Sequence, residues 1–277
     1  MNIPSCGAAV AATGQGRSGA GCHSCFARPA CLPGDRLDTD CQALDRLVER
    51  RHVLLRGEHL YHAGEPVRQR LFAIQHGHFK VYQLAADGRQ RVTGFPAAGD
   101  LLGIECIGAS HHRNSVAALT DAMLCEFSHA RLADAAARDE ALALRLNRLL
   151  LAQVGREHAT GTLLSCNSAD QRLAAFLRLL STQRFNRFAN GDQLELVMTR
   201  ADMGDYLGLA AETVSRTLKR FQMLGYLAVG ARKVTLLDAA SLRLLARGAS
   251  AGSANNHTGP APTNCGAGPV ADRKERP

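Results

Sequence analysis

Short apolar segments alternate with turn signals through the first half of the chain. Between residues 53 and 127, glycines recur about every eleven to thirteen residues and separate these segments. Such spacing predicts short strands in an antiparallel roll or sandwich. The clearest hairpin candidate is LFAIQHGHFKVYQL, in which Phe72 and Ile74 alternate before the turn. Phe79 and Val81 alternate after it.

A long helix is predicted for residues 131–160. This segment has no proline and one glycine, and leucines stand at helical spacing in it: Leu142, Leu146, Leu149 and Leu150. Its apolar surface exceeds what the flank of one domain needs, which favours a coiled-coil-like seam between two copies of the chain. Packing of the helix on its own roll is the alternative.

The carboxyl half has the pattern of a winged helix-turn-helix. A helix around residues 169–182 opens it. Thr199 and Asp202 form a capping-box-like helix start, Gly208 breaks that helix, and a second amphipathic segment begins near Ala211. The segment YLAVGARKVTLL then predicts a small β wing.

The second helix of this motif has two different faces. At about 100° per residue, one face is apolar, with Val214, Leu218 and Phe221. The opposite face is polar and carries Glu212, Ser215, Arg216 and Lys219. An arginine can bind guanine O6 and N7, a glutamate can accept from cytosine N4, and a small serine lets the backbone approach thymine. The pattern favours DNA binding over an ordinary solvated helix face.

Composition agrees with a polyanionic partner. The 277 residues include 33 Lys and Arg against 25 Asp and Glu, a formal net charge of +8. No apolar run approaches the ~20 residues of a membrane span, and the amino terminus lacks the pattern of a secretory signal. We therefore expect a cytoplasmic protein without a membrane partner. Both ends of the chain are rich in small residues without periodicity, which predicts disorder.

Three cysteines near the amino end have the spacing of metal ligands. The chain has nine cysteines, which in the cytoplasm favour ligation or buried thiols over disulfides. Cys22, Cys25 and Cys31 follow the pattern C-x2-C-x5-C and can wrap one metal centre, with a fourth ligand from elsewhere. Spacing alone fits zinc and an iron-sulfur cluster equally well. The cysteines without a motif are read as ordinary thiols: Cys6, Cys41, Cys166 and Cys265.

A roll, a long helix and a winged helix-turn-helix together resemble the cyclic-AMP receptor protein/FNR superfamily of transcription regulators, and its oxygen-sensing branch most of all. The resemblance covers about residues 21–245 and rests on the strings TGFPAAGDLLGIECIGASHH, DQRLAAFLRLL and MTRADMGDYLGLAAETVSRTLKRFQMLGYLAV. It implies an α+β fold with an amino-terminal antiparallel β-roll sensory domain, a long dimerisation helix and a carboxyl-terminal winged helix-turn-helix. The domains expected are a disordered segment 1–20, a cluster-binding loop and roll 21–130, a dimerisation helix 131–162, a DNA-binding domain 163–247 and a disordered tail 248–277.

The resemblance also implies a 4Fe-4S cluster whose fourth ligand is Cys125. Read from the residues alone, Cys125 could be a small buried hydrophobe, and Cys106 is the rival ligand. A zinc- or thiol-based regulator of the same fold is an alternative. An iron-sulfur electron carrier or enzyme is another, but it leaves the helix-turn-helix unexplained, and the chain has no Ser-His-Asp, Walker or dinucleotide motif.

The function implied is that of a homodimer that binds double-stranded DNA when oxygen is absent and works with RNA polymerase. The residues of its recognition helix match those with which the family reads DNA. The resemblance therefore implies an inverted-repeat DNA site like TTGAT-N4-ATCAA. Glu157 matches an acidic residue of the family's dimer seam, and Ala210 stands where the family has a Ser or Thr helix cap. The phosphate-binding Arg-Ser pair of cyclic-nucleotide receptors is replaced by Asn114-Ser115, which disfavours cyclic AMP.

Overall fold

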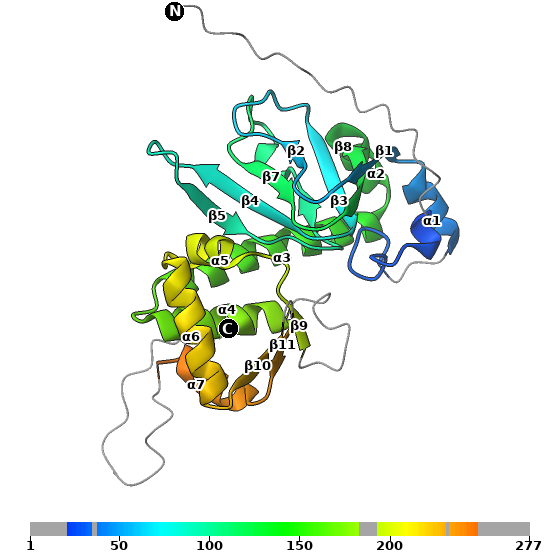
Figure 1. Ribbon diagram of the computed structural model, residues 1–277. Helices are drawn as coiled ribbons and strands as arrows, with labels where there is room; N and C mark the ends of the chain where they lie inside the picture. The colour runs from blue at the N-terminus through cyan, green and yellow to red at the C-terminus, as the bar shows by residue number, and fades with distance from the viewer. Residues whose placement is uncertain (1–20, 35–37, 183–192, 231–232, 249–277) are drawn as a thin grey trace, which may run out of the picture.

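The computed structural model describes residues 21–34, 38–182, 193–230 and 233–248. Figure 1 shows a β-roll above a helical domain, with one long helix running between them. This is the α+β arrangement predicted from the sequence. The two segments predicted to be disordered lie outside the described residues, except for Gly248.

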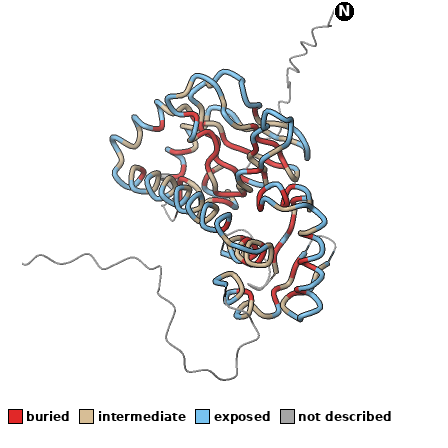
Figure 2. The backbone as a smooth tube through the Cα atoms, turned by 90° about the vertical axis from the view of Figure 1, so that its left-hand side faces the viewer, coloured by how far each residue is buried: buried red, intermediate tan, exposed pale blue. Residues whose placement is uncertain are grey.

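Two four-stranded antiparallel sheets make the roll. One has the strand order β1-β8-β3-β6 and the other β2-β7-β4-β5. The strands are β1 (Val48–Leu54), β2 (His59–Tyr61), β3 (Arg70–His76), β4 (Phe79–Leu84), β5 (Gln90–Gly94), β6 (Leu101–Leu102), β7 (Ser115–Ala118) and β8 (Ala122–Ser128). Residues such as Ile74, Phe79 and Leu124 are fully buried between the sheets, and Figure 2 shows this buried interior.

The hairpin predicted from LFAIQHGHFKVYQL is wrong. β3 pairs with β8 and β6, whereas β4 pairs with β5 and β7, so the two strands belong to different sheets. The chain crosses between the sheets at Gly77, which has φ of 95°. A Cβ there would lie 2.6 Å from that of Ala122, so only glycine fits this crossing. The alternation identified both strands correctly but could not tell which partners they choose.

Two helices replace the single helix predicted for residues 131–160. They are α2 (His129–Arg138) and α3 (Glu140–Leu164). The chain breaks at Asp139, which has an extended conformation and whose side chain accepts a hydrogen bond from the backbone of Leu142 at 3.0 Å. An aspartate with this geometry caps the start of a new helix. The pattern of apolar residues concealed the break because it continues on both sides.

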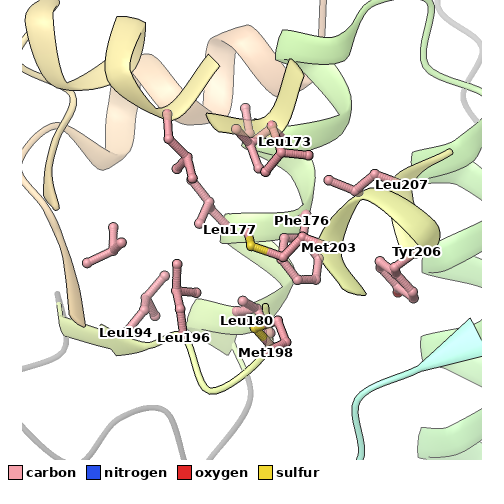
Figure 3. Packing of buried hydrophobic residues seen from close by; sticks show 14 of the residues in the cluster. Leu173, Phe176, Leu177, Leu180, Leu194, Leu196, Met198, Met203, Tyr206 and Leu207 are labelled. Carbon is pink, nitrogen blue, oxygen red and sulfur yellow. The ribbon is translucent and has the colours of Figure 1, made fainter. Parts of the chain in front are cut away.

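The carboxyl-terminal domain packs four helices and a small sheet around one core. It contains α4 (Ala169–Thr182), α5 (Arg200–Leu207), α6 (Ala211–Met223), α7 (Ala239–Ala246) and the strands β9 (Gln193–Glu195), β10 (Leu227–Val229) and β11 (Lys233–Leu236). Figure 3 shows Leu173, Phe176 and Leu177 of α4 directed into this core with Met203 of α5. The predicted bounds of α4 and the β wing are confirmed, while β9, which pairs with β11, was not predicted.

Three short helical segments complete the described chain: η1 (Cys22–Ser24), α1 (Asp38–Asp45) and η2 (Ile104–Cys106). Within the described ranges, no helix is both long and apolar enough to cross a membrane.

Candidate metal centre and nucleic-acid interface

The structure gathers the four cysteines proposed as ligands around one cavity. Cys22 lies in η1, Cys25 and Cys31 lie in the turns that follow, and Cys125 lies in β8. The remaining walls are mostly apolar, with Leu32, Pro33, Leu44, Ala73 and Phe127. Sequence positions almost a hundred residues apart therefore meet at one place, because the amino-terminal loop packs against the sheet that contains β8.

The cysteine-bearing loop has a defined local structure. The backbone N–H of Arg28 donates to the carbonyl of Cys25 at 3.0 Å, and that of Cys31 donates to the carbonyl of Ala27 at 2.9 Å. Ala27 and Leu32 are buried and fasten the loop to the roll. Consecutive turns closed by hydrogen bonds bring residues of the C-x2-C-x5-C segment close together.

Asp45 and Arg51 hold the other side of the cavity. The backbone N–H of Cys22 donates to Oδ1 of Asp45 at 3.2 Å, and Nη2 of Arg51 donates to the same oxygen at 2.6 Å. Arg51 also lines the cavity. Its Nε is buried without a hydrogen-bond partner.

Burial governs the acidity of the thiols. It raises the pKa of Cys31 to about 12. It also raises the pKa of Cys125 to about 11, although the charge of Arg51 acts in the opposite direction. The pKa of Cys22 is raised as well, first by burial and then by the charge of Asp45. Thiols with such pKa values stay protonated near neutral pH unless a bound cation replaces the protons.

These residues fit a metal group bound by thiolates. Four thiolates give such a group a net negative charge, and sulfur atoms accept hydrogen bonds. The unpaired, buried Nε of Arg51 therefore matches it in both charge and polarity. The cavity, however, encloses only about 20 Å³. In the described part of the chain, no three Cys, His, Asp or Glu side chains have the arrangement of an ion site. The walls must therefore move apart to enclose a cluster.

Cys106, the rival fourth ligand, does not line this cavity. It is buried in η2, where its Sγ lies 2.9 Å from Nδ1 of His112 and 3.6 Å from Oε1 of Glu105. Cys41 is buried without lining the cavity, and Cys166 is half-buried at the end of α3. Cys6 and Cys265 lie outside the described residues.

The helix-turn-helix has the geometry predicted for it. Thr199 accepts from the backbone of Asp202 while the Asp202 carboxylate accepts from the backbone of Thr199, which completes a capping box at α5. Gly208 ends α5 with φ of 65°, a left-handed conformation. Ala210 is the N-cap of α6 and makes no side-chain cap.

α6 presents the predicted polar face to solvent. Its apolar face is buried, with Val214, Leu218 and Phe221, and the four predicted contact residues are exposed: Glu212, Ser215, Arg216 and Lys219. Nε of Arg216 lies 3.9 Å from Oε1 of Glu212. This exposed pair contributes little to stability but keeps the two side chains on one strip of the helix.

Most leucines predicted for the dimer seam face the roll of their own protomer, which corrects the prediction. Leu142 is only 2% exposed because it packs into the roll of its own protomer, so it cannot also contact a second copy. Leu146 and Leu149 pack against the same core and are half-buried, as is Leu150. Glu157 is exposed and borders a cavity of about 450 Å³ between the roll and the carboxyl-terminal domain. The exposed apolar residues of α3 are Leu144, Leu151, Val154 and Leu164.

Sequence reasoning missed three charged residues that shape these sites. Arg51 lines the cysteine cavity, Arg145 of α3 holds the cysteine loop, and Lys80 reaches Asp202 from the roll. Arg145 and Lys80 contact partners far away in the chain, and no local motif marks any of the three residues.

Both halves of the chain match families of known proteins. Residues 51–139 match the family model described as a cyclic nucleotide-binding domain, and residues 171–245 match that of a Crp-like helix-turn-helix domain. The fumarate and nitrate reduction regulatory proteins of Salmonella typhimurium and Escherichia coli are both 35% identical over 225 residues, which is 81% of this chain and 90% of theirs. Among solved structures, FixK2 from Bradyrhizobium japonicum is 29% identical, with a TM-score of 0.62, over 71% of this chain and 96% of that one.

The fold and the exposed recognition helix define a transcription regulator of the helix-turn-helix class, a kind of protein that binds DNA. The chain belongs to the family of fumarate and nitrate reduction regulatory proteins.

Proposed function

We propose that the chain is an oxygen-responsive regulator that carries a 4Fe-4S cluster and binds DNA as a homodimer. The observation that carries this proposal is the cavity that unites the three loop cysteines with Cys125 and leaves Cys106 outside. Cys22, Cys25, Cys31 and Cys125 would hold the cluster through their sulfur atoms. When bound, such a cluster supplies a redox centre, and the family resemblance adds its sensitivity to oxygen.

The chain's own residues provide the surroundings of that centre. Leu32 and Phe127 exclude water from the cavity, which limits access of solvent. Arg51 supplies a positive charge beside Cys125, and its buried Nε has no hydrogen-bond partner among the described residues. Asp45 keeps Arg51 in place through the 2.6 Å ion pair.

In the proposed complex, α6 lies in the major groove of the target site. Arg216 would bind guanine, Glu212 would accept from cytosine N4, and Ser215 would lie against thymine. Lys219 would contact a phosphate. A two-fold dimer sets two such helices one turn of DNA apart, which suits an inverted repeat such as TTGAT-N4-ATCAA.

Dimerisation is proposed to use the outer side of α3. Leu144, Leu151 and Val154 are exposed there, and Leu150 lies at the border of the buried face. Apolar residues exposed along a long helix are typical of a helix-helix seam. Glu157 would lie near its own copy across the two-fold axis.

The remaining partners are also part of the proposal. RNA polymerase follows from the regulator class, and a cytoplasmic location follows from DNA as the target. No cyclic nucleotide is expected, because the hydroxyl of Ser115 accepts from the backbone of Ala63, Asn114 accepts from Gln83, and Arg113 is exposed to solvent.

Anaerobic purification followed by iron and sulfide analysis and an absorption spectrum tests this function. We expect iron and sulfide in equal amounts and a visible absorbance that decays in air. Cys125→Ser should abolish the cluster, because a hydroxyl substitutes poorly for a thiolate at iron. Cys106→Ser is the matched control and should keep it. Zinc without iron, or loss of iron from the Cys106 variant alone, would overturn the proposal.

A further inference from the structure

The amino-terminal half of α3 packs directly on the cysteine loop. Leu142, Arg145, Leu146 and Leu149 stand at i, i+3, i+4 and i+7, so they share one helix face. The three leucines on that face pack into the same core as Cys22 and Cys125. Cys31 and Leu32 of the loop belong to this core as well.

Arg145 is the polar residue of that face, and its side chain binds the backbone of the cysteine loop. Its Nε donates to the carbonyl oxygen of Cys31 at 2.8 Å, and its Nη2 donates to the carbonyl oxygen of Pro29 at 2.8 Å. Gly34, with φ of 60°, lies against the same guanidinium, where a Cβ would approach Nε to 3.3 Å. The planar fork of arginine therefore holds two loop carbonyls at once in a fixed geometry, whereas the donors of an ammonium group rotate freely.

We propose that Arg145 is a positioning residue that couples the cysteine loop to the dimerisation helix. Cys31 would bind iron through Sγ, while its carbonyl is bound to α3 through Arg145. This inference rests on the proposed function, and it adds the contact through which the loop acts on α3.

The size of the cavity shows why this contact would transmit movement. The cavity has about 20 Å³ of space, which is room for little more than one water molecule. Enclosing four iron and four sulfide atoms therefore requires the loop to shift. Two short hydrogen bonds to a helix of 25 residues convert a shift of Cys31 into a displacement of α3. The opposite face of α3 contains Leu151, which is 69% exposed, so the displacement acts on the surface available to a second copy.

The test compares Arg145→Gln with Arg138→Gln in the full-length chain. Arg138 is exposed at the end of α2, away from the proposed seam, so its variant controls for the loss of a positive charge near the start of α3. Iron, sulfide and the visible spectrum report whether the cluster is bound. Sedimentation velocity, with and without the cluster, reports the dissociation constant of the dimer.

We expect Arg145→Gln to bind as much iron as the parent while its cluster-loaded dimer weakens by about tenfold, within the range usual for coupling between two sites. Its cluster-free dimer constant should equal that of the parent, which a merely structural role of Arg145 would not predict. Arg138→Gln should match the parent in both states.

Two results would overturn the inference. One is a cluster-loaded Arg145→Gln dimer as tight as the parent's. The other is loss of the cluster from both Arg145→Gln and Arg145→Lys, which would make Arg145 a support of the cluster site alone. A parent chain that takes up no iron would instead contradict the proposed function, and this is measured before any variant is compared.

Discussion

Neighbouring groups give two buried cysteines of the roll different chemistry. Cys125 lies beside the guanidinium of Arg51, a permanent positive charge that favours the thiolate. Burial and the adjacent Glu105 carboxylate together raise the pKa of Cys106 to about 12. A metal ligand must lose its thiol proton. The surroundings of Cys125 favour this loss through Arg51, whereas Glu105 opposes it at Cys106. At the scale of residues, the charged neighbour thus separates Cys125 from Cys106, the two candidates for the fourth ligand.

The same reasoning applies to the exposed face of α6. Arg216→Ala should weaken binding to the specific site by about 1–3 kcal/mol and flatten discrimination at its G·C pair, because the bidentate contact with guanine is lost. Lys219→Ala is the matched comparison and should weaken all sequences alike. Binding to a panel of substituted half-sites measures both effects. If Arg216→Ala lost the same binding free energy on specific and on random DNA, Arg216 would not be a residue that recognises bases.

Capping residues determine where several helices of this molecule begin. Asp139 separates α2 from α3 with a side-chain cap, and the capping box of Thr199 and Asp202 starts α5. α6 begins at Ala210, which has the extended conformation of an N-cap, with φ of −68° and ψ of 144°, but no side-chain acceptor. Among α2, α3, α5, α6 and α7, the recognition helix α6 is therefore the one that begins without a side-chain cap.

Ala210→Ser should stabilise the chain by about 0.5–2 kcal/mol, because a serine at the N-cap accepts a hydrogen bond from the first turn of α6. Chemical denaturation followed by circular dichroism would measure the gain. Ala211→Ser makes the same chemical change one residue later, inside the helix, and should bring no gain. If both variants had the same stability, the missing cap would not matter.

At the scale of the whole molecule, polar and aromatic contacts join the roll to the DNA-binding domain. Nζ of Lys80 lies 2.7 Å from Oδ1 of Asp202, with side chains 18% and 8% exposed. The hydroxyls of Thr160 and Tyr206 are 2.6 Å apart, and the Tyr206 ring packs against Phe95 of the roll. Asp202 thus caps α5 and also binds the sensory domain, so the start of the helix-turn-helix is tied directly to the roll.

Lys80→Gln should destabilise the folded chain by about 1–3 kcal/mol, since it leaves a buried carboxylate without its charged partner. Burial alone would raise the pKa of Asp202, but hydrogen bonds from Lys80 and Thr199 lower it below its usual value. A lowered pKa contributes stability above the unfolded pKa, and this stability disappears as pH falls through the folded pKa. The difference between Lys80→Gln and the parent should therefore shrink at acidic pH.

Denaturation midpoints at neutral and acidic pH measure this effect. Lys233→Gln, at an exposed position of β11, is the control and should match the parent. A constant difference across the pH range would contradict the role given to the ion pair.

The dimer itself provides a second test at this scale. Glu157 is exposed in the protomer, and next to a two-fold axis it would face its own copy. Like charges repel in a partly dry interface, so Glu157→Ala should raise the dimer fraction of the aerobic protein in sedimentation. An unchanged fraction would place Glu157 away from the axis.

Residues close together in the sequence determined much of the local structure of this protein. The bounds of α4, the capping box of α5, the left-handed Gly208 and the two faces of α6 all follow from hydrogen bonds and side-chain spacing inside one or two helical turns. The sequence also contained the signal of the break at Asp139, a cap residue followed by glutamate.

Contacts between distant residues were decided only by the tertiary structure. β3 and β4 lie in different sheets, Leu142 turns toward its own roll, Cys125 rather than Cys106 joins the loop cysteines, and Arg145 reaches a loop 114 residues away. Periodicity shows that a face is buried but does not identify what covers it, because each partner is chosen by the packing of the whole chain.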